Sequence, residues 1–192
     1  MTYSSRIIAV IALFSAAVIT GCGSMLAGVE SNAIEEDPGR RTIGRQVTDE
    51  SIETKAIVNI HAANGSFDDA SFTVVSYNGF VLITGEVPST ELKDQATEVI
   101  RRIEGVRRIY NELIVGPVSD AATRAKDTWL TTKIKTSLLT TSDTPAIRVK
   151  VVTENSVVYL MGLVTQPEAD RIAGETAEVN GVERVVQLFE II

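Results

Sequence analysis

The stretch SFTVVSYNGFVLITGEV, residues 71–87, decides the fold of this chain. Two apolar runs lie on either side of Asn78-Gly79. An Asn-Gly pair between such runs is the strongest short-range signal for a β-hairpin, because both residues tolerate the positive φ angles of a tight turn. The sequence therefore predicts strands over 71–76 and 80–87, joined by a two-residue turn.

Helical patterns flank this hairpin on both sides. A helix is predicted over 48–63, with Thr48 as its N-cap. Three apolar residues recur at helical spacing along it and form one face: Ile52, Ala56 and Ile60. A second helix is predicted from Pro88-Ser89 to residue 102, and a third strand over 106–115. The order of elements is αββαβ.

The same order recurs 78 positions later. A second helix with the same apolar face runs through 124–140, and that face consists of Leu130, Ile134 and Leu138. The remaining predicted elements are a strand over 149–153, a turn at Glu154-Asn155, a strand over 157–164, a helix over 167–179 and a strand over 182–191. The repeat predicts an α+β fold with two domains, 47–116 and 120–192. Because the connection between them is short and each domain alone buries a modest core, we expect the two to pack against each other.

The first residues have the pattern of a processing signal. Arg6 precedes an apolar run over 7–19 that is too short to span a bilayer, which needs about 20 residues. The run ends in Ile19-Thr20-Gly21-Cys22, which is similar to a bacterial lipobox. We therefore expect a signal peptide over 1–21, lipidation of Cys22, and a flexible tether over 22–46.

Composition argues against several functional classes. The chain has 192 residues and a net charge of −7, so we expect no nucleic-acid partner. His61 is the only histidine and Cys22 the only cysteine, and neither has partners at metal-ligand or nucleophile–base spacing. We expect no cofactor, no metal and no enzymatic activity.

A second apolar face distinguishes the helix over 124–140. Trp129 and Leu139 project away from the buried stripe, with Thr132 and Thr136 between them and Lys133 beside Trp129. The corresponding positions of the first repeat hold Ser and His. Because the first repeat reaches the same fold without apolar residues there, the fold alone does not require Trp129 and Leu139. Cations lie at both edges of the strip: Arg124, Lys126, Lys133 and Lys135. Alternatively, Trp129 packs on the first domain or on a neighbouring loop, and the lysines are simply solvated.

The repeat resembles the BON domain. The resemblance is carried by the strand motifs at 78–85 (NGFVLITG) and 155–162 (NSVVYLMG), and it is strengthened by the stretches DTWLTTK at 127–133 and YLMGLVT at 159–165. Together with the lipobox and tether, these features resemble the dual-BON outer-membrane lipoproteins. The resemblance implies an outer-membrane anchor on the periplasmic face, a role in envelope integrity at division sites, and binding of anionic phospholipid of the phosphatidylglycerol or cardiolipin type. It places that binding on the first helix of the second domain. The phospholipid-binding residues expected here are Trp129, Thr132, Lys133, Lys135, Thr136, Leu139, Thr140, Gly162 and Leu163.

Two functions of different classes remain open at this point. One is membrane binding through the Trp129 and Leu139 face. The other is an adaptor in which the same face docks a periplasmic protein involved in envelope assembly or peptidoglycan remodelling.

Overall fold

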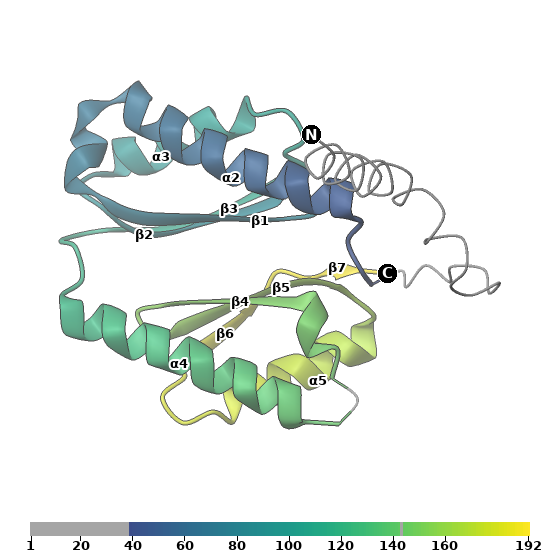
Figure 1. The fold of residues 1–192 in the computed structure, drawn as a ribbon. Coiled ribbons are helices and arrows are strands. Elements are labelled where there is room, and N and C mark those ends of the chain that lie inside the picture. The colour runs from purple at the N-terminus through teal and green to yellow at the C-terminus, as the bar shows by residue number, and fades with distance from the viewer. Residues whose placement is uncertain (1–38, 143) are drawn as a thin grey trace, which may run out of the picture. The chain divides into compact units, whose positions relative to one another are not determined.

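The computed structural model describes residues 39–142 and 144–192 (Figure 1). The first repeat comprises α2 (Ile43–Ala63), η1 (Gly65–Asp69), β1 (Ser71–Tyr77), β2 (Phe80–Val87), α3 (Thr90–Arg101) and β3 (Arg108–Val115). Its sheet has the order β1-β2-β3, with β1 antiparallel and β3 parallel to β2. Both helices lie on one face of this sheet (Figure 1).

The second repeat has the same architecture. It comprises α4 (Ala121–Thr140), η2 (Ala146–Arg148), β4 (Val149–Glu154), β5 (Val157–Val164), α5 (Gln166–Ala177), β6 (Arg184–Gln187) and β7 (Glu190–Ile191). The strand β5 is central, antiparallel to β4 and parallel to β6 and β7. The predicted α+β fold of tandem αββαβ units is confirmed.

Each repeat has its own apolar core, and the predicted helix faces supply part of both. Ile52, Ala56 and Ile60 of α2 are buried against the first sheet, together with Phe67 of η1. In the second repeat the stripe Leu130, Ile134 and Leu138 is buried in the corresponding place. The 3.6-residue period of the apolar positions therefore identified which side of each helix seats on its sheet.

A third apolar cluster joins the two repeats. This shared cluster consists of Val75, Tyr77, Phe80, Leu82, Tyr159, Met161 and Leu188. Because side chains alternate along a strand, these residues lie on the sheet faces that the helices leave uncovered. Polar contacts accompany the cluster: the Tyr77 hydroxyl donates to the Arg148 carbonyl at 2.7 Å, and Lys150 Nζ lies 2.8 Å from Glu53 Oε1.

The helix α2 begins earlier than the sequence predicts. Its N-cap is Thr42, whose hydroxyl accepts a hydrogen bond from the Arg45 N–H at 3.3 Å. Thr48, the predicted N-cap, lies inside the helix and donates to the Gly44 carbonyl at 2.9 Å. Residues 43–46, expected in the tether, are therefore helical. An ion pair of 2.7 Å between Arg41 and Asp49 ties the entering chain to the helix, and no apolar period reveals such a contact.

The second hairpin turn lies one position later than predicted. Glu154 pairs with Val157 across the strands, so the turn is Asn155-Ser156 rather than Glu154-Asn155. Both turn residues have positive φ angles, 49° and 63°. Serine is uncommon in this conformation, which is why the pattern pointed to the wrong pair.

A buried aspartate holds each hairpin turn. Asp127 of α4 accepts the backbone N–H groups of Asn155 and Ser156 at 2.7 and 2.9 Å. Asp49 of α2 does the same for the first turn, at 2.8 and 2.9 Å. This helix-to-turn clamp compensates the conformational cost of the tight turns, and it fixes the hairpin relative to the helix that carries the aspartate.

The last predicted strand is interrupted. Where a continuous strand over 182–191 was expected, β6 and β7 are separated by Leu188 and Phe189. The register along β5 is unchanged across the gap. The ring of Phe189 packs beside Gly162, at 3.6 Å from where a Cβ on that glycine would lie. The last strand is interrupted at this contact.

Candidate functional site

The helix α4 positions the predicted site. Its N-cap is Asp120, whose carboxylate accepts the Thr123 N–H at 2.8 Å. That hydrogen bond lowers the pKa of Asp120, so the carboxylate stays charged where it complements the helix dipole. With Leu130, Ile134 and Leu138 at most 1% exposed, the rotation of the helix about its axis is fixed. The opposite side must then face away from the core.

That opposite side carries large exposed apolar side chains. Trp129 is 59% exposed and Leu139 is 67% exposed. Thr132 and Thr136 lie between them and are also exposed. These four residues, with Thr140, are called the outer strip below. The alternative in which Trp129 packs on the first domain or on a neighbouring loop is wrong.

The threonines of the outer strip turn their hydroxyl groups back onto the helix. Thr132 donates to the Thr128 carbonyl at 3.0 Å, Thr136 to the Thr132 carbonyl at 2.9 Å, and Thr140 to the Thr136 carbonyl at 3.1 Å. Their donors are thus satisfied without water, and a surface placed against the strip does not leave them unpaired. The strip behaves as more apolar than its composition suggests.

Two lysines lie at the edges of the strip. Lys133 Nζ is 5.1 Å from the centroid of the Trp129 ring and donates to the Asn180 carbonyl at 3.1 Å. Lys135 is exposed, and its ammonium has no hydrogen-bond or ion-pair partner within 39–142 and 144–192. The other two predicted edge cations are tied elsewhere, since Lys126 Nζ donates to the Ser156 hydroxyl at 2.9 Å and Arg124 donates to the Ser119 carbonyl.

Ile147 extends this surface and was missed by the sequence reasoning. It lies in η2 and is 93% exposed. With Leu139 and Lys135 it lines a hollow of about 150 Å³ beside the end of α4. The sequence does contain an apolar residue in the polar loop between the helix and the next strand. A single loop residue has no helical or strand periodicity that would assign it to a surface, so its place beside the strip is seen only in the folded structure.

Gly162 and Leu163 lie apart from the outer strip, although the sequence reasoning grouped them with it. Leu163 is half-buried and packs against the shared cluster on the far side of the sheet from α4. Gly162 is buried in β5, where an added Cβ would lie 2.9 Å from the Arg148 carbonyl oxygen. A close backbone approach explains this glycine.

The outer face of α2 is apolar too. Ile43 is 80% exposed, and Val47, Ile57 and Val58 are also exposed. These positions of α2 are not the counterparts of Trp129 and Leu139, which are Ser51 and His61. The contrast between the repeats therefore lies in the kind of exposed side chain, an interfacial tryptophan with a lysine on its ring in α4 and aliphatic residues in α2.

The other predictions concern the N-terminal segment, membrane-spanning helices and His61. Cys22, the signal peptide and most of the tether lie outside the described residues. No helix in the described part of the chain is long and apolar enough to cross a bilayer. His61 lies at the end of α2, 3.4 Å from Asp68 and against the ring of Phe72, and the described residues contain no cluster of potential metal ligands.

Comparisons with known proteins agree with the repeated architecture. The BON domain family model matches residues 48–117 and 126–192. The chain is 36% identical to the outer membrane lipoprotein DolP of Haemophilus influenzae, over 90% of this chain and 89% of that one. It is 35% identical to a 21 kDa hemolysin of Actinobacillus pleuropneumoniae, covering 79% and 78% of the two chains. It is also 30% identical to osmotically-inducible protein Y of Escherichia coli, covering 81% and 79%.

Proposed function

The chain belongs to the BON-domain family, and from this premise we propose that it is an outer-membrane lipoprotein whose second domain binds anionic phospholipid through the outer strip of α4. The lipid on Cys22 anchors it to the periplasmic face, and the strip docks on the membrane in support of envelope integrity at division sites. The role is one of binding rather than catalysis. One observation carries the proposal: Trp129 and Leu139 are both more than half exposed on a helix whose other face is completely buried.

The side chains of the strip suit a membrane interface. A tryptophan ring is apolar with one polar N–H, and such rings gather at the level of the lipid headgroups. Burying Leu139 or Ile147 among acyl chains contributes about 1.5–3 kcal/mol each. Lys133 and Lys135 stand where their ammonium groups reach headgroup phosphates while their stems follow the apolar surface.

Electrostatics explains why the lysines are needed. The whole chain carries a net charge of −7, so an anionic membrane repels it at long range. Each cation close to an anionic surface contributes about 1 kcal/mol. Two cations bordering the strip offset that repulsion locally and orient α4 toward the lipid.

The anchor and the strip work together. Lost translational freedom on association costs at least about 4 kcal/mol, which a few side chains barely offset. Tethering by a lipid makes the second contact intramolecular and raises its effective concentration. We therefore expect weak vesicle binding by the unlipidated chain and firm docking in the anchored protein.

The test is vesicle binding by unlipidated protein. Residues 22–192 carrying Cys22→Ser are titrated with vesicles containing phosphatidylglycerol, and Trp129 fluorescence or sedimentation reports binding. Trp129→Glu should abolish sedimentation with the vesicles because it places a carboxylate in the headgroup region, and it should not alter folding since the side chain is exposed. Val58→Glu, the same kind of change on the outer face of α2, is the matched control and should bind like the parent.

A second candidate function is a protein adaptor, favoured by the apolar outer face of α2. Binding that needs anionic lipid and weakens with added salt supports the membrane function. Loss of vesicle binding in Val58→Glu but not in Trp129→Glu would remove α4 from the proposal. Absence of vesicle binding altogether, with capture of a defined envelope protein through either helix face, would favour the adaptor.

A further inference from the structure

The hollow of about 150 Å³ beside the end of α4 opens between that helix, η2 and the start of β4. Its floor consists of Leu138, Val149 and Val151, which are at most 9% exposed and belong to the second core. Its rim consists of Leu139 and Ile147, which are exposed. The hollow therefore leads from the surface of the second repeat to its apolar core.

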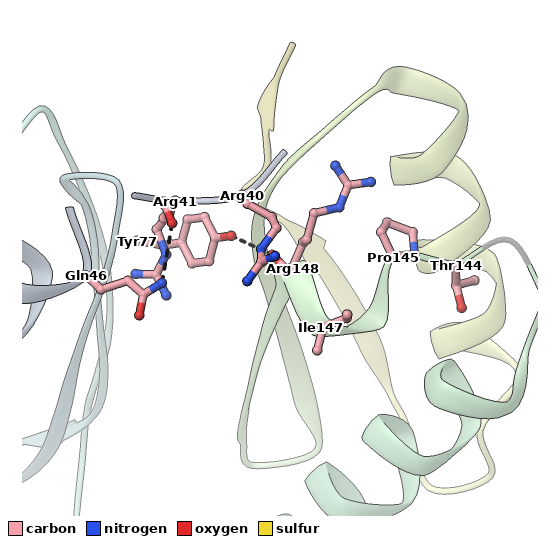
Figure 2. A pocket seen from close by; sticks show the side chains of 8 residues that line it. All are labelled: Arg40, Arg41, Gln46, Tyr77, Thr144, Pro145, Ile147 and Arg148. Carbon is pink, nitrogen blue, oxygen red and sulfur yellow. Dashed lines mark hydrogen bonds between the residues drawn. The ribbon is translucent and has the colours of Figure 1, made fainter. Parts of the chain in front are cut away.

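The backbone beside Ile147 is held by hydrogen bonds. The Arg148 N–H donates to the Pro145 carbonyl at 2.8 Å. The Arg148 carbonyl accepts a hydrogen bond of 2.7 Å from the Tyr77 hydroxyl of the first repeat (Figure 2). Ile147 is thus presented to the surface by a fixed segment, and its exposure is a property of the fold.

The hollow offers few partners to water. Six of the seven described residues that line it are apolar. The nearby carbonyls at the end of α4 are already paired, since Ser137 accepts from the Thr141 N–H and Leu138 from the Thr144 hydroxyl. Among the described residues, the one buried side-chain polar atom without a hydrogen bond belongs to Thr84, which does not line the hollow. A water molecule needs two to four polar partners, so an apolar occupant fits better.

Lys135 supplies the one charge of the lining. Its side chain lines the hollow and is exposed, and its ammonium has no hydrogen-bond or ion-pair partner within 39–142 and 144–192. A lysine can lay its stem along apolar surface while its ammonium reaches a phosphate. An apolar hollow with one free cation at its side matches a molecule that joins an anionic head to a hydrocarbon chain.

Docking of the outer strip would bring such a molecule to the hollow. Leu139 and Ile147 stand on its rim, so a membrane that covers both side chains also covers the opening. An apolar space of roughly 150 Å³ accepts a hydrocarbon the size of benzene, about six carbon atoms. The hollow therefore has room for a short stretch of one acyl chain and not for a whole lipid.

We propose that this hollow receives a stretch of one acyl chain of an anionic phospholipid, whose headgroup phosphate lies at Lys135. The inference rests on the proposed membrane function. It adds to the contact between strip and membrane a defined site for a single lipid molecule.

The experiment detects the chain at the floor of the hollow. Residues 22–192 with Cys22→Ser are studied by NMR in small bicelles containing phosphatidylglycerol, and nuclear Overhauser effects are measured between acyl-chain protons and protein methyl groups. Docking of the strip alone gives contacts to the exposed Leu139 and Ile147. The proposal expects contacts to the buried methyl groups of Leu138 and Val151 as well. Bicelles of phosphatidylcholine alone should give neither.

A variant that fills the hollow provides the second arm. Ala146 lines the hollow, so Ala146→Leu should remove the contacts to Val151 and keep those to Leu139. It should weaken binding to phosphatidylglycerol vesicles about fourfold, the effect of roughly one buried methylene. Ala62→Leu adds the same atoms at an exposed position of α2 and is the matched control, which should behave like the parent.

Each outcome decides between the two proposals. Contacts to Leu139 without contacts to Leu138 or Val151 in the parent would overturn the hollow and leave the membrane function in place. This result does not depend on the folding of any variant. Loss of every lipid contact, together with absence of vesicle binding, would overturn both proposals. Floor resonances that shift with protein concentration in the absence of lipid would make the occupant a second copy of the chain, which would also overturn the lipid assignment.

Discussion

At the scale of single residues, Glu154 has a strongly raised pKa. It ends β4, and burial raises the pKa of its carboxyl to about 7, with the carboxylates of Glu86 and Asp127 acting in the same direction. Glu86 is itself only 4% exposed and accepts from the Asn155 amide at 2.7 Å. The surroundings of Glu154 at the second hairpin therefore favour its protonated form.

We predict that the protein loses stability as the pH rises through this range. The ordinary carboxyl pKa is 4.5 and the folded value is about 7. Between these values the folded protein keeps a proton that the unfolded chain releases, so the contribution is complete below pH 4.5 and is lost as the pH rises through about 7. Glu154→Gln removes this dependence and should become progressively more stable than the parent from pH 4.5 to 8.

Urea unfolding at pH 4.5, 6 and 8 measures this difference. The exposed Glu91→Gln is the matched control and should follow the parent at each pH. The titration of Asp49 does not contribute to this difference between pH 4.5 and 8. Burial opposes its ionisation, but hydrogen bonds from Ser76, Gly79 and Arg41 outweigh that effect and lower its pKa, so its contribution is lost only at more acidic pH. Parallel stability curves for parent and Glu154→Gln would contradict the prediction.

At the scale of elements, the helix-to-turn clamp is the feature that both repeats share beyond their apolar pattern. Asp127 is 4% exposed and satisfies two turn N–H groups. The clamp fixes α4 relative to the hairpin, and so it also fixes the direction in which the outer strip faces. A structural residue thereby positions the proposed binding surface.

Asp127→Ala should destabilise the protein by about 1–3 kcal/mol, because it leaves the buried N–H of Ser156 and the partly buried N–H of Asn155 without their acceptor. The exposed Asp94→Ala removes the same charge from α3 and should change the free energy of unfolding by less than about 0.5 kcal/mol. Chemical denaturation measures both. Equal effects of the two changes would show that charge, and not the clamp, is responsible.

At the scale of the whole molecule, the shared cluster couples the repeats. Its members come from β1, β2 and β5 and from the segment between β6 and β7. Domains of about 70 residues are marginal alone, and burying their open sheet faces together supplies the missing apolar area. The shared cluster thus joins the first repeat to the second repeat, which carries the proposed lipid-binding strip.

Met161→Ala should lower the stability of both repeats. Met161 is fully buried in the shared cluster, and truncating such a side chain costs about 2–5 kcal/mol. Hydrogen exchange should therefore quicken at the amides of β2 as well as of β5. Ile172→Ala, a comparable truncation in the second core only, should affect the second repeat more than β2. Unchanged β2 protection in Met161→Ala would mean that the repeats unfold independently.

The sequence by itself determined the repeat, the order of its elements, the apolar helix faces and the first hairpin turn. These features depend on local periodicity and on residues with special backbone preferences, and both can be read along the chain. Most elements end within about two residues of the prediction for the same reason. The outer strip with Trp129 was predicted too, because a second apolar face on a helix is also periodic.

Only the tertiary structure decided which surfaces are free. The exposure of Trp129, the separation of Gly162 and Leu163 from the strip, and the addition of Ile147 depend on contacts between segments far apart in sequence. The early start of α2 and the Asn155-Ser156 turn follow from ion pairs and hydrogen bonds to Asp49 and Asp127. A contact between segments far apart in the chain produces no periodic pattern in the sequence, so these features are seen only in the folded structure.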